Sequence, residues 1–188
     1  MILKLVQINF NILNMRNLIL LLLSFNFVHA QMAIGKDVTS NSDISLEFSD
    51  TEPRGILLPW VTSHTNVLNA VDGTFIYDTS DQSIKHMKNG NWFDLSEHNN
   101  GKVDTSLQDN ETERVEAKVV IGNNAVSDST PGILVLSDSD KAMVLPKVAN
   151  PHENIINPAP GTMVYDTTNK LLAVFNGTVW TFWKPSGN

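Results

Sequence analysis

The stretch HTNVLNAVDGTFIYDTSDQSIKHMKNGNWF at residues 64–93 returns as HENIINPAPGTMVYDTTNKLLAVFNGTVWTF at residues 152–182. The first 16 positions of the two stretches align without a gap, and half of them are identical. The similarity extends upstream to Ile34-Gly35 in the first copy and to Ile121-Gly122 in the second, 87 residues later. A period of this kind indicates that the chain contains two copies of one structural module.

The end of each copy predicts two antiparallel strands. Residues 74–77 (TFIY) and 162–165 (TMVY) are rich in β-branched and aromatic side chains, which favour strands. Each is followed by Asp-Thr and a polar turn, and then by an apolar return segment at residues 84–87 or 171–175. A β-hairpin is therefore expected in each copy.

An Asn-Gly pair follows each return segment, at residues 89–90 and 176–177. Asn-Gly is typical of a two-residue hairpin turn in which both central residues take positive φ. The segment after the turn carries Trp92 in the first copy and Trp180 in the second. Each copy is thus predicted to end in a β-meander of three short strands, with tryptophan packed on one face.

The upstream part of each copy predicts shorter elements. Residues 46–48 and 134–136 are short apolar segments that stop at Ser-Asp, which reads as a first strand and a turn. A second apolar run ends at Leu-Pro, where Pro59 or Pro146 is expected to stop the strand because proline has no amide donor.

Between these runs and the meander, residues 64–69 and 152–157 place two aliphatic residues between asparagines. This pattern predicts one helical or irregular turn, attached to the core by both aliphatic side chains. Gly73 and Gly161 then separate the turn from the meander.

The predicted fold class is all-β, with modules at residues 31–96 and 118–188. The polar segment at residues 97–117 is predicted to be a linker or exposed loop, with a short solvated helix from Asp104 onward as the alternative. A module of about 60 residues buries little apolar surface on its own. Packing against the other copy, or intertwining of three chains into a homotrimer, would supply the missing core area.

The N-terminal region predicts export. Residues 15–30 (MRNLILLLLSFNFVHA) combine one Arg, an apolar run and small residues before a cleavage site, as in a signal peptide. The apolar run is shorter than a membrane-spanning helix, which is the alternative. We expect residues 1–30 to be removed before Gln31, translation to begin at Met15, and the mature chain to be periplasmic, extracellular or on the cell surface.

Composition excludes several function classes. The formal net charge is −7, and no cluster of Lys and Arg provides the basic surface that nucleic-acid binding requires. The chain contains no cysteine, which excludes disulfides, thiolate catalysis and a lipidated N-terminal cysteine. The mature chain is expected to have no membrane span.

The second copy resembles a repeat of exported Bacteroidota proteins and phage tail-fibre proteins, of the form G-x-L-x-P, P-x-x-G-x-x-x-Y-x-T and Y-x-N-G-x-x-W. The positions that fit it in the first copy are Pro59, Gly73, Tyr77, Thr79, Asn89, Gly90 and Trp92, and those in the second are Pro146, Pro158, Gly161, Tyr165, Thr167, Asn176, Gly177 and Trp180. The usual Arg after the proline is replaced by Trp60 or Lys147. The resemblance implies a fibrous, often trimeric, adhesion or appendage protein.

The histidine pair His64 and His152 is the candidate for site chemistry that repeats. It favours a structural hydrogen bond, with a metal held by three imidazoles on a trimer axis as the alternative. Acidic Ser-Asp turns are interpreted as caps rather than Ca²⁺ ligands. Trp60, which has no counterpart in the second copy, is the candidate for stacking on a sugar.

The sequence predicts no catalytic residue, because no nucleophile elbow or phosphate loop is present, and no cofactor. We therefore predict a non-enzymatic, exported structural or adhesion subunit that self-associates as a homotrimer. The alternatives are an accessory subunit of an outer-membrane secretion or gliding complex, which would need envelope partners, and a carbohydrate-binding module with a glycan ligand.

Overall fold

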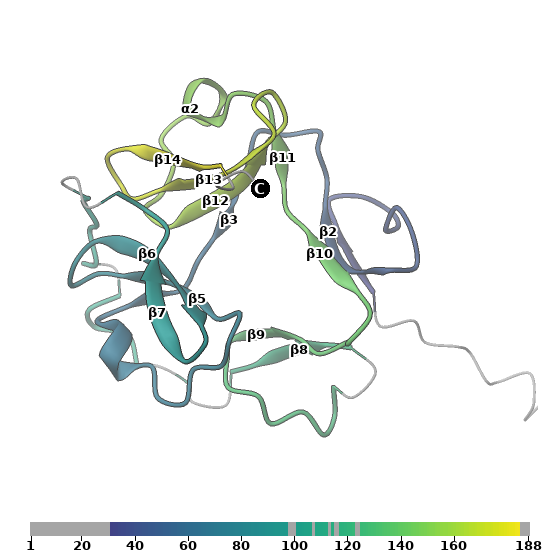
Figure 1. Ribbon diagram of the computed structural model, residues 1–188, viewed down its shortest axis with the longest axis horizontal. Helices are drawn as coiled ribbons and strands as arrows, with labels where there is room; N and C mark the ends of the chain where they lie inside the picture. The colour runs from purple at the N-terminus through teal and green to yellow at the C-terminus, as the bar shows by residue number, and fades with distance from the viewer. Residues whose placement is uncertain are drawn as a thin grey trace, which may run out of the picture.

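The computed structural model describes residues 31–97, 101–106, 108–112, 114, 117–122 and 125–184. The fold is all-β, as the sequence predicts, with short helical turns between strands (Figure 1). The first copy contains β1 (Met32–Ile34), β2 (Ile44–Phe48), β3 (Ile56–Leu57), β4 (Trp60–Val61), the 3₁₀ turn η1 (His64–Asn66), β5 (Phe75–Asp78), β6 (Ser83–Lys88) and β7 (Asn91–Asp94). The second contains β8 (Val119–Ile121), β9 (Leu134–Leu136), β10 (Ala142–Val144), β11 (Lys147–Val148), α2 (Pro151–Asn154), β12 (Thr162–Asp166), β13 (Leu171–Phe175) and β14 (Trp180–Trp183). The two copies therefore match element for element.

Both predicted meanders are present. Strands β5, β6 and β7 pair in antiparallel order, and β12, β13 and β14 repeat the arrangement. Tyr77 pairs with Ile84 in the first meander, and Tyr165 pairs with Leu172 in the second. The register is thus the same in the two copies.

Each meander has a fourth, parallel strand that the sequence did not predict. Pro59 and Pro146 end the preceding apolar run as expected, but the next two residues form β4 or β11. The Pro59 carbonyl accepts a hydrogen bond from the Tyr77 amide at 2.8 Å, and the Pro146 carbonyl accepts one from the Tyr165 amide at 2.9 Å. Proline suits this position because its missing amide is not needed and its carbonyl begins the ladder.

The two Asn-Gly turns differ. Asn89 (φ 52°) and Gly90 (φ 70°) both take positive φ, as predicted. The prediction was wrong for Asn176, because only Gly177 (φ 98°) has positive φ there. The hairpin has the same length, but its Asn-Gly pair is shifted by one residue, and the Asn176 side chain accepts hydrogen bonds from the Thr178 and Val179 amides.

Strands are exchanged between the copies. Strand β3 of the first copy pairs with β12 of the second, and β10 of the second pairs with β2 of the first. Figure 1 shows the two meanders side by side, the β2–β10 pair on the opposite side of the molecule, and β8 with β9 apart from both.

The meanders share one apolar core. Its buried members are Leu58, Tyr77, Ile84 and Leu95 from the first copy and Met163 and Val174 from the second. Val103, from the segment predicted to be a linker, packs against the same cluster. The described part of that segment contains turns and no helix. The copies supply the core area that each lacks alone.

Candidate functional site

Three polar contacts, one of them buried, join the two copies. The Tyr77 hydroxyl donates to the Asn176 carbonyl at 2.9 Å in a fully buried position. The Trp183 indole donates to the Leu95 carbonyl at 2.5 Å, and the Asn176 side chain donates to the Glu97 carbonyl at 3.0 Å. Each bond links the first meander, or the segment that follows it, to the second, so the three together hold the two meanders against each other.

Trp60 belongs to this junction. Its indole is half-buried, donates to the Pro160 carbonyl at 2.7 Å and lies with its ring centroid 6.3 Å from that of Tyr77. The buried edge and the hydrogen bond give Trp60 a packing role between the copies. Its predicted role in glycan stacking stays a prediction.

A buried aspartate ends the first meander strand of each copy. Asp78 accepts hydrogen bonds from the His64 amide and from the Ser80 amide and hydroxyl. Asp166, in the equivalent position, accepts hydrogen bonds from the Thr168 amide and the Asn169 side chain. These carboxylates organise the polar turn that follows.

Burial opposes ionisation of Asp78. The hydrogen bonds from Ser80 and His64 outweigh this effect and lower the pKa of the carboxyl to about 2. Asp166 shows the same balance. Burial alone would raise its pKa, but hydrogen bonds from Asn169 and Thr168 outweigh burial, and the net effect is a lowered pKa. Both side chains are therefore charged at neutral pH.

The two predicted histidines lie in equivalent helical turns, but their partners differ. His64 places Nδ1 2.6 Å from Asp78 Oδ2, which is the kind of structural hydrogen bond that the sequence favoured. His152 is exposed, with Nε2 3.7 Å from Glu153 Oε1 and its ring edge-on to Phe182. A common metal site for both histidines stays a prediction.

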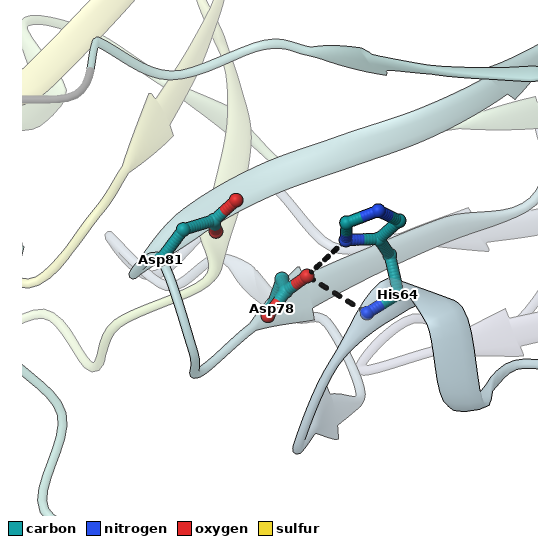
Figure 2. A group of neighbouring side chains, drawn as sticks. All are labelled: His64, Asp78 and Asp81. Carbon is teal, nitrogen blue, oxygen red and sulfur yellow. Dashed lines mark hydrogen bonds and ion pairs between the residues drawn. The ribbon is translucent and has the colours of Figure 1, made fainter.

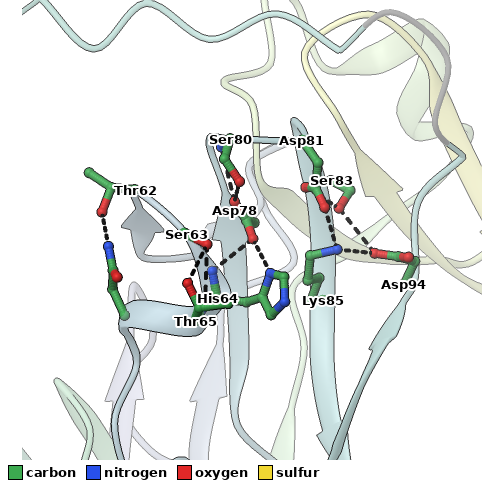
Figure 3. A network of polar contacts seen from close by, with 11 residues as sticks. Thr62, Ser63, His64, Thr65, Asp78, Ser80, Asp81, Ser83, Lys85 and Asp94 are labelled. Atoms are coloured by element: carbon green, nitrogen blue, oxygen red, sulfur yellow. Dashed lines mark hydrogen bonds and ion pairs between the residues drawn. The ribbon is translucent and has the colours of Figure 1, made fainter.

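His64, Asp78 and Asp81 each offer a ligand atom, and these atoms lie within 4.8 Å of one another. Figure 2 shows Asp78 turned toward His64, with Asp81 on the neighbouring turn. Asp81 is already paired with the Lys85 ammonium, which also contacts Asp94 at 2.6 Å (Figure 3). Because this positive charge lies beside the group, the geometry favours a structural network over a cation site.

Other repeat-defining residues lie in equivalent turns and strands of the two copies. Gly73 (φ 91°) and Gly161 (φ 88°) donate to the Met87 and Phe175 carbonyls in equivalent bonds. Trp92 and Trp180 are half-buried in the last strand of each hairpin, where they pair with Met87 and Phe175. These positions set the turn and hairpin geometry that the two copies share.

The second aliphatic residue after the helical turn faces solvent in both copies. The sequence predicted that both aliphatic residues after the helical turn pack inward, and Val67 and Ile155 are indeed partly buried. Leu68 and Ile156, however, are 76% and 85% exposed, so this prediction was wrong for them. Each is followed by an asparagine with positive φ, Asn69 (60°) or Asn157 (52°), which turns the chain away from the core.

The family comparison concerns the second copy. Residues 121–187 match the phage tail like trimerisation region. The match covers β9 to β14, the junction residue Asn176 and the exposed Ile156. The predicted tail-fibre-like resemblance is confirmed for this module, and its element-by-element match to the first copy extends the same architecture across the described chain.

No curated protein and no solved structure matches the chain. Within the described residues, no helix is long and apolar enough to cross a membrane.

Two sets of residues at the site were not predicted from the sequence. Asp78 and Asp166 had a detectable signal, since both follow the meander tyrosine in the gap-free part of the repeat. The hydrogen bond from Tyr77 to the second copy had no signal in the sequence, because Tyr165 occupies the same repeat position and is only half-buried.

Proposed function

We propose that the protein is a self-associating structural subunit of tail-fibre-like type, active as a homotrimer and exported to the cell envelope or surface. The observation that carries the proposal is the match of residues 121–187 to the phage tail like trimerisation region. The fold agrees with a structural role, since the repeated polar residues of the described chain organise turns and the contact between the copies.

The exposed aliphatic residues support self-association. Leu68 and Ile156 occupy the same position in two copies whose sequences otherwise differ at half of the aligned positions. Isolated exposed apolar residues are common on protein surfaces, but retention of the property at a repeated position favours a contact surface. A second copy of this chain is the partner that the family match favours.

Export rests on residues 15–30 and agrees with the position of Gln31. The Gln31 side-chain amide lies 2.8 Å from the Ile44 carbonyl and 3.0 Å from the Ser42 carbonyl. The residue expected at the mature N-terminus is therefore part of the fold. N-terminal sequencing of protein recovered from the envelope should begin at Gln31, and a chain that retains residues 15–30 would contradict cleavage.

The oligomeric state tests the central proposal. Light scattering after size exclusion of residues 31–188 should give the mass of three chains. A mass of one chain would overturn the homotrimer and would direct attention to an accessory subunit that requires other envelope proteins.

A matched pair of variants tests the contact residues. The double substitution Leu68→Ser and Ile156→Ser should weaken the trimer, so that it dissociates at higher protein concentration. Val126→Ser changes another fully exposed aliphatic residue and should leave the mass unchanged. If both variants dissociate at the same protein concentration, Leu68 and Ile156 do not belong to the contact between chains.

A further inference from the structure

The two copies build the same small parallel sheet, but only one of these sheets is complete. Strand β1 pairs with β2 in the first copy, and β8 pairs with β9 in the second. The Ser49 amide donates to the Ile34 carbonyl at 2.8 Å, and the Ser137 amide donates to the Ile121 carbonyl at 2.9 Å. Strand β9 is therefore the counterpart of β2.

Strand β10 covers the second edge of β2. The Ala142 amide donates to the Asp43 carbonyl at 2.8 Å, and Met143 pairs with Leu46. Within the described residues, β9 has no strand on the corresponding edge. The consequence is visible in equivalent leucines, since Leu46 is 1% exposed and Leu134 is 47% exposed.

The main chain of β9 offers hydrogen bonds at this edge. The Ile133 carbonyl and the Ser137 amide both bond to β8. Because main-chain groups alternate between the two edges of a strand, the amides and carbonyls of Leu134 and Leu136 face the opposite side. An edge of this kind is a template for pairing with another chain.

The outer edge of β10 is open in the same sense. Strand β10 is the last strand of the sheet β1-β2-β10 in the described chain, and Met143 is 37% exposed. Five residues separate β9 from β10, which is too short for the crossover that parallel pairing within one chain requires. The two open edges can therefore join in parallel only between different chains.

We propose that the free edge of β9 pairs in parallel with the outer edge of β10 in a second copy of this chain. The pairing would give a continuous sheet in the order β1, β2, β10, then β9 and β8 of the neighbour. Each chain would pair its β9 edge with one neighbour and its β10 edge with the other neighbour. Such a heterologous contact can close into a ring of identical subunits. The inference rests on the proposed homotrimer and names the strands that form it.

Leu134→Pro tests the edge. Proline at this position removes an amide that faces away from β8, so the β8–β9 ladder keeps its hydrogen bonds. The mass in solution should fall from three chains to one, while circular dichroism stays unchanged. Leu134→Val keeps the amide and should remain a trimer.

Cysteine pairing provides a second readout that does not depend on the proline variant being folded. The chain has no cysteine of its own, so Leu134→Cys and Met143→Cys proteins can be refolded together and oxidised. Disulfide-linked dimers should form in the mixture and not in a mixture of Leu134→Cys with Val126→Cys. A wild-type trimer that persists in Leu134→Pro, or that gives no 134–143 cross-link, would overturn the edge pairing alone. A wild-type monomer would overturn the homotrimer and the edge pairing together.

Discussion

Tyr77→Phe should destabilise the protein far more than Tyr165→Phe, although the two tyrosines occupy the same repeat position. The Tyr77 side chain is fully buried, and its hydroxyl donates to the Asn176 carbonyl of the other copy at 2.9 Å. Removing the donor from a buried carbonyl should lower the free energy of unfolding by about 1–3 kcal/mol. Tyr165 is half-buried, and its hydroxyl has no hydrogen-bond partner in the described part of the chain, so a change within about 0.5 kcal/mol is expected.

Urea unfolding followed by tryptophan fluorescence measures this difference. Both variants should be compared with the wild type at one protein concentration, because assembly contributes to apparent stability. Equal losses in the two variants would refute the reasoning that the bond between the copies, rather than the repeat position, determines the cost.

The same pair of variants allows a direct titration. Burial, together with the nearby negative charge of Asp81, raises the pKa of Tyr77 from 10.0 to about 12. The chain has two tyrosines, so Tyr165→Phe leaves Tyr77 as the single phenol, and its absorbance change should occur near pH 12 in the folded protein. Because the folded-state pKa lies above the unfolded value, this group stabilises the fold fully below pH 10 and loses that contribution as the pH rises toward 12. A transition near pH 10 with the fold intact would contradict the burial of the hydroxyl.

Two further predictions concern a glycine pair and a buried carboxylate. Gly161→Ala should lower the thermal midpoint more than Gly73→Ala. Both glycines have φ near 90°, but a methyl group at Gly161 would approach the Tyr77 Cβ to 3.1 Å, and one at Gly73 would meet nothing within 4 Å. A hydrogen bond from Ser40, and an ion pair with Lys36, hold the pKa of the buried Glu47 at about 2 despite desolvation. Because this value lies below the unfolded pKa of 4.5, stability should fall as the pH drops from about 5 to 2, and Glu47→Gln should flatten that decline in acid unfolding curves.

The sequence predicts the meanders well because their signals are local. Strand residues, the polar turn and the Asn-Gly pair at residues 89–90 lie next to one another in the chain. Strands β4 and β11 had no comparable signal, since two residues are too few to show a period. Asn176 was misassigned because a shift of one residue changes which turn position an asparagine occupies.

The contacts between the copies could not be predicted from the repeat. A repeat predicts what the two copies have in common, whereas the junction depends on where they differ. Tyr77 bonds across the junction while Tyr165 does not, and Leu46 is covered while Leu134 is exposed. This asymmetry arises because strands more than 90 residues apart in the chain pair with each other. A local sequence pattern carries no information on such pairing.

The shared core has a consequence for the timing of folding during synthesis. The cluster around Tyr77 closes only when Met163 and Val174 are available, near the C-terminal end of the described chain. The segment that contains Met163 and Val174 must therefore be synthesised before the first copy can reach its final packing. If the chain is exported in an unfolded state, as proposed, this delay would keep the first copy from its final packing until residues 163–174 have also crossed the membrane.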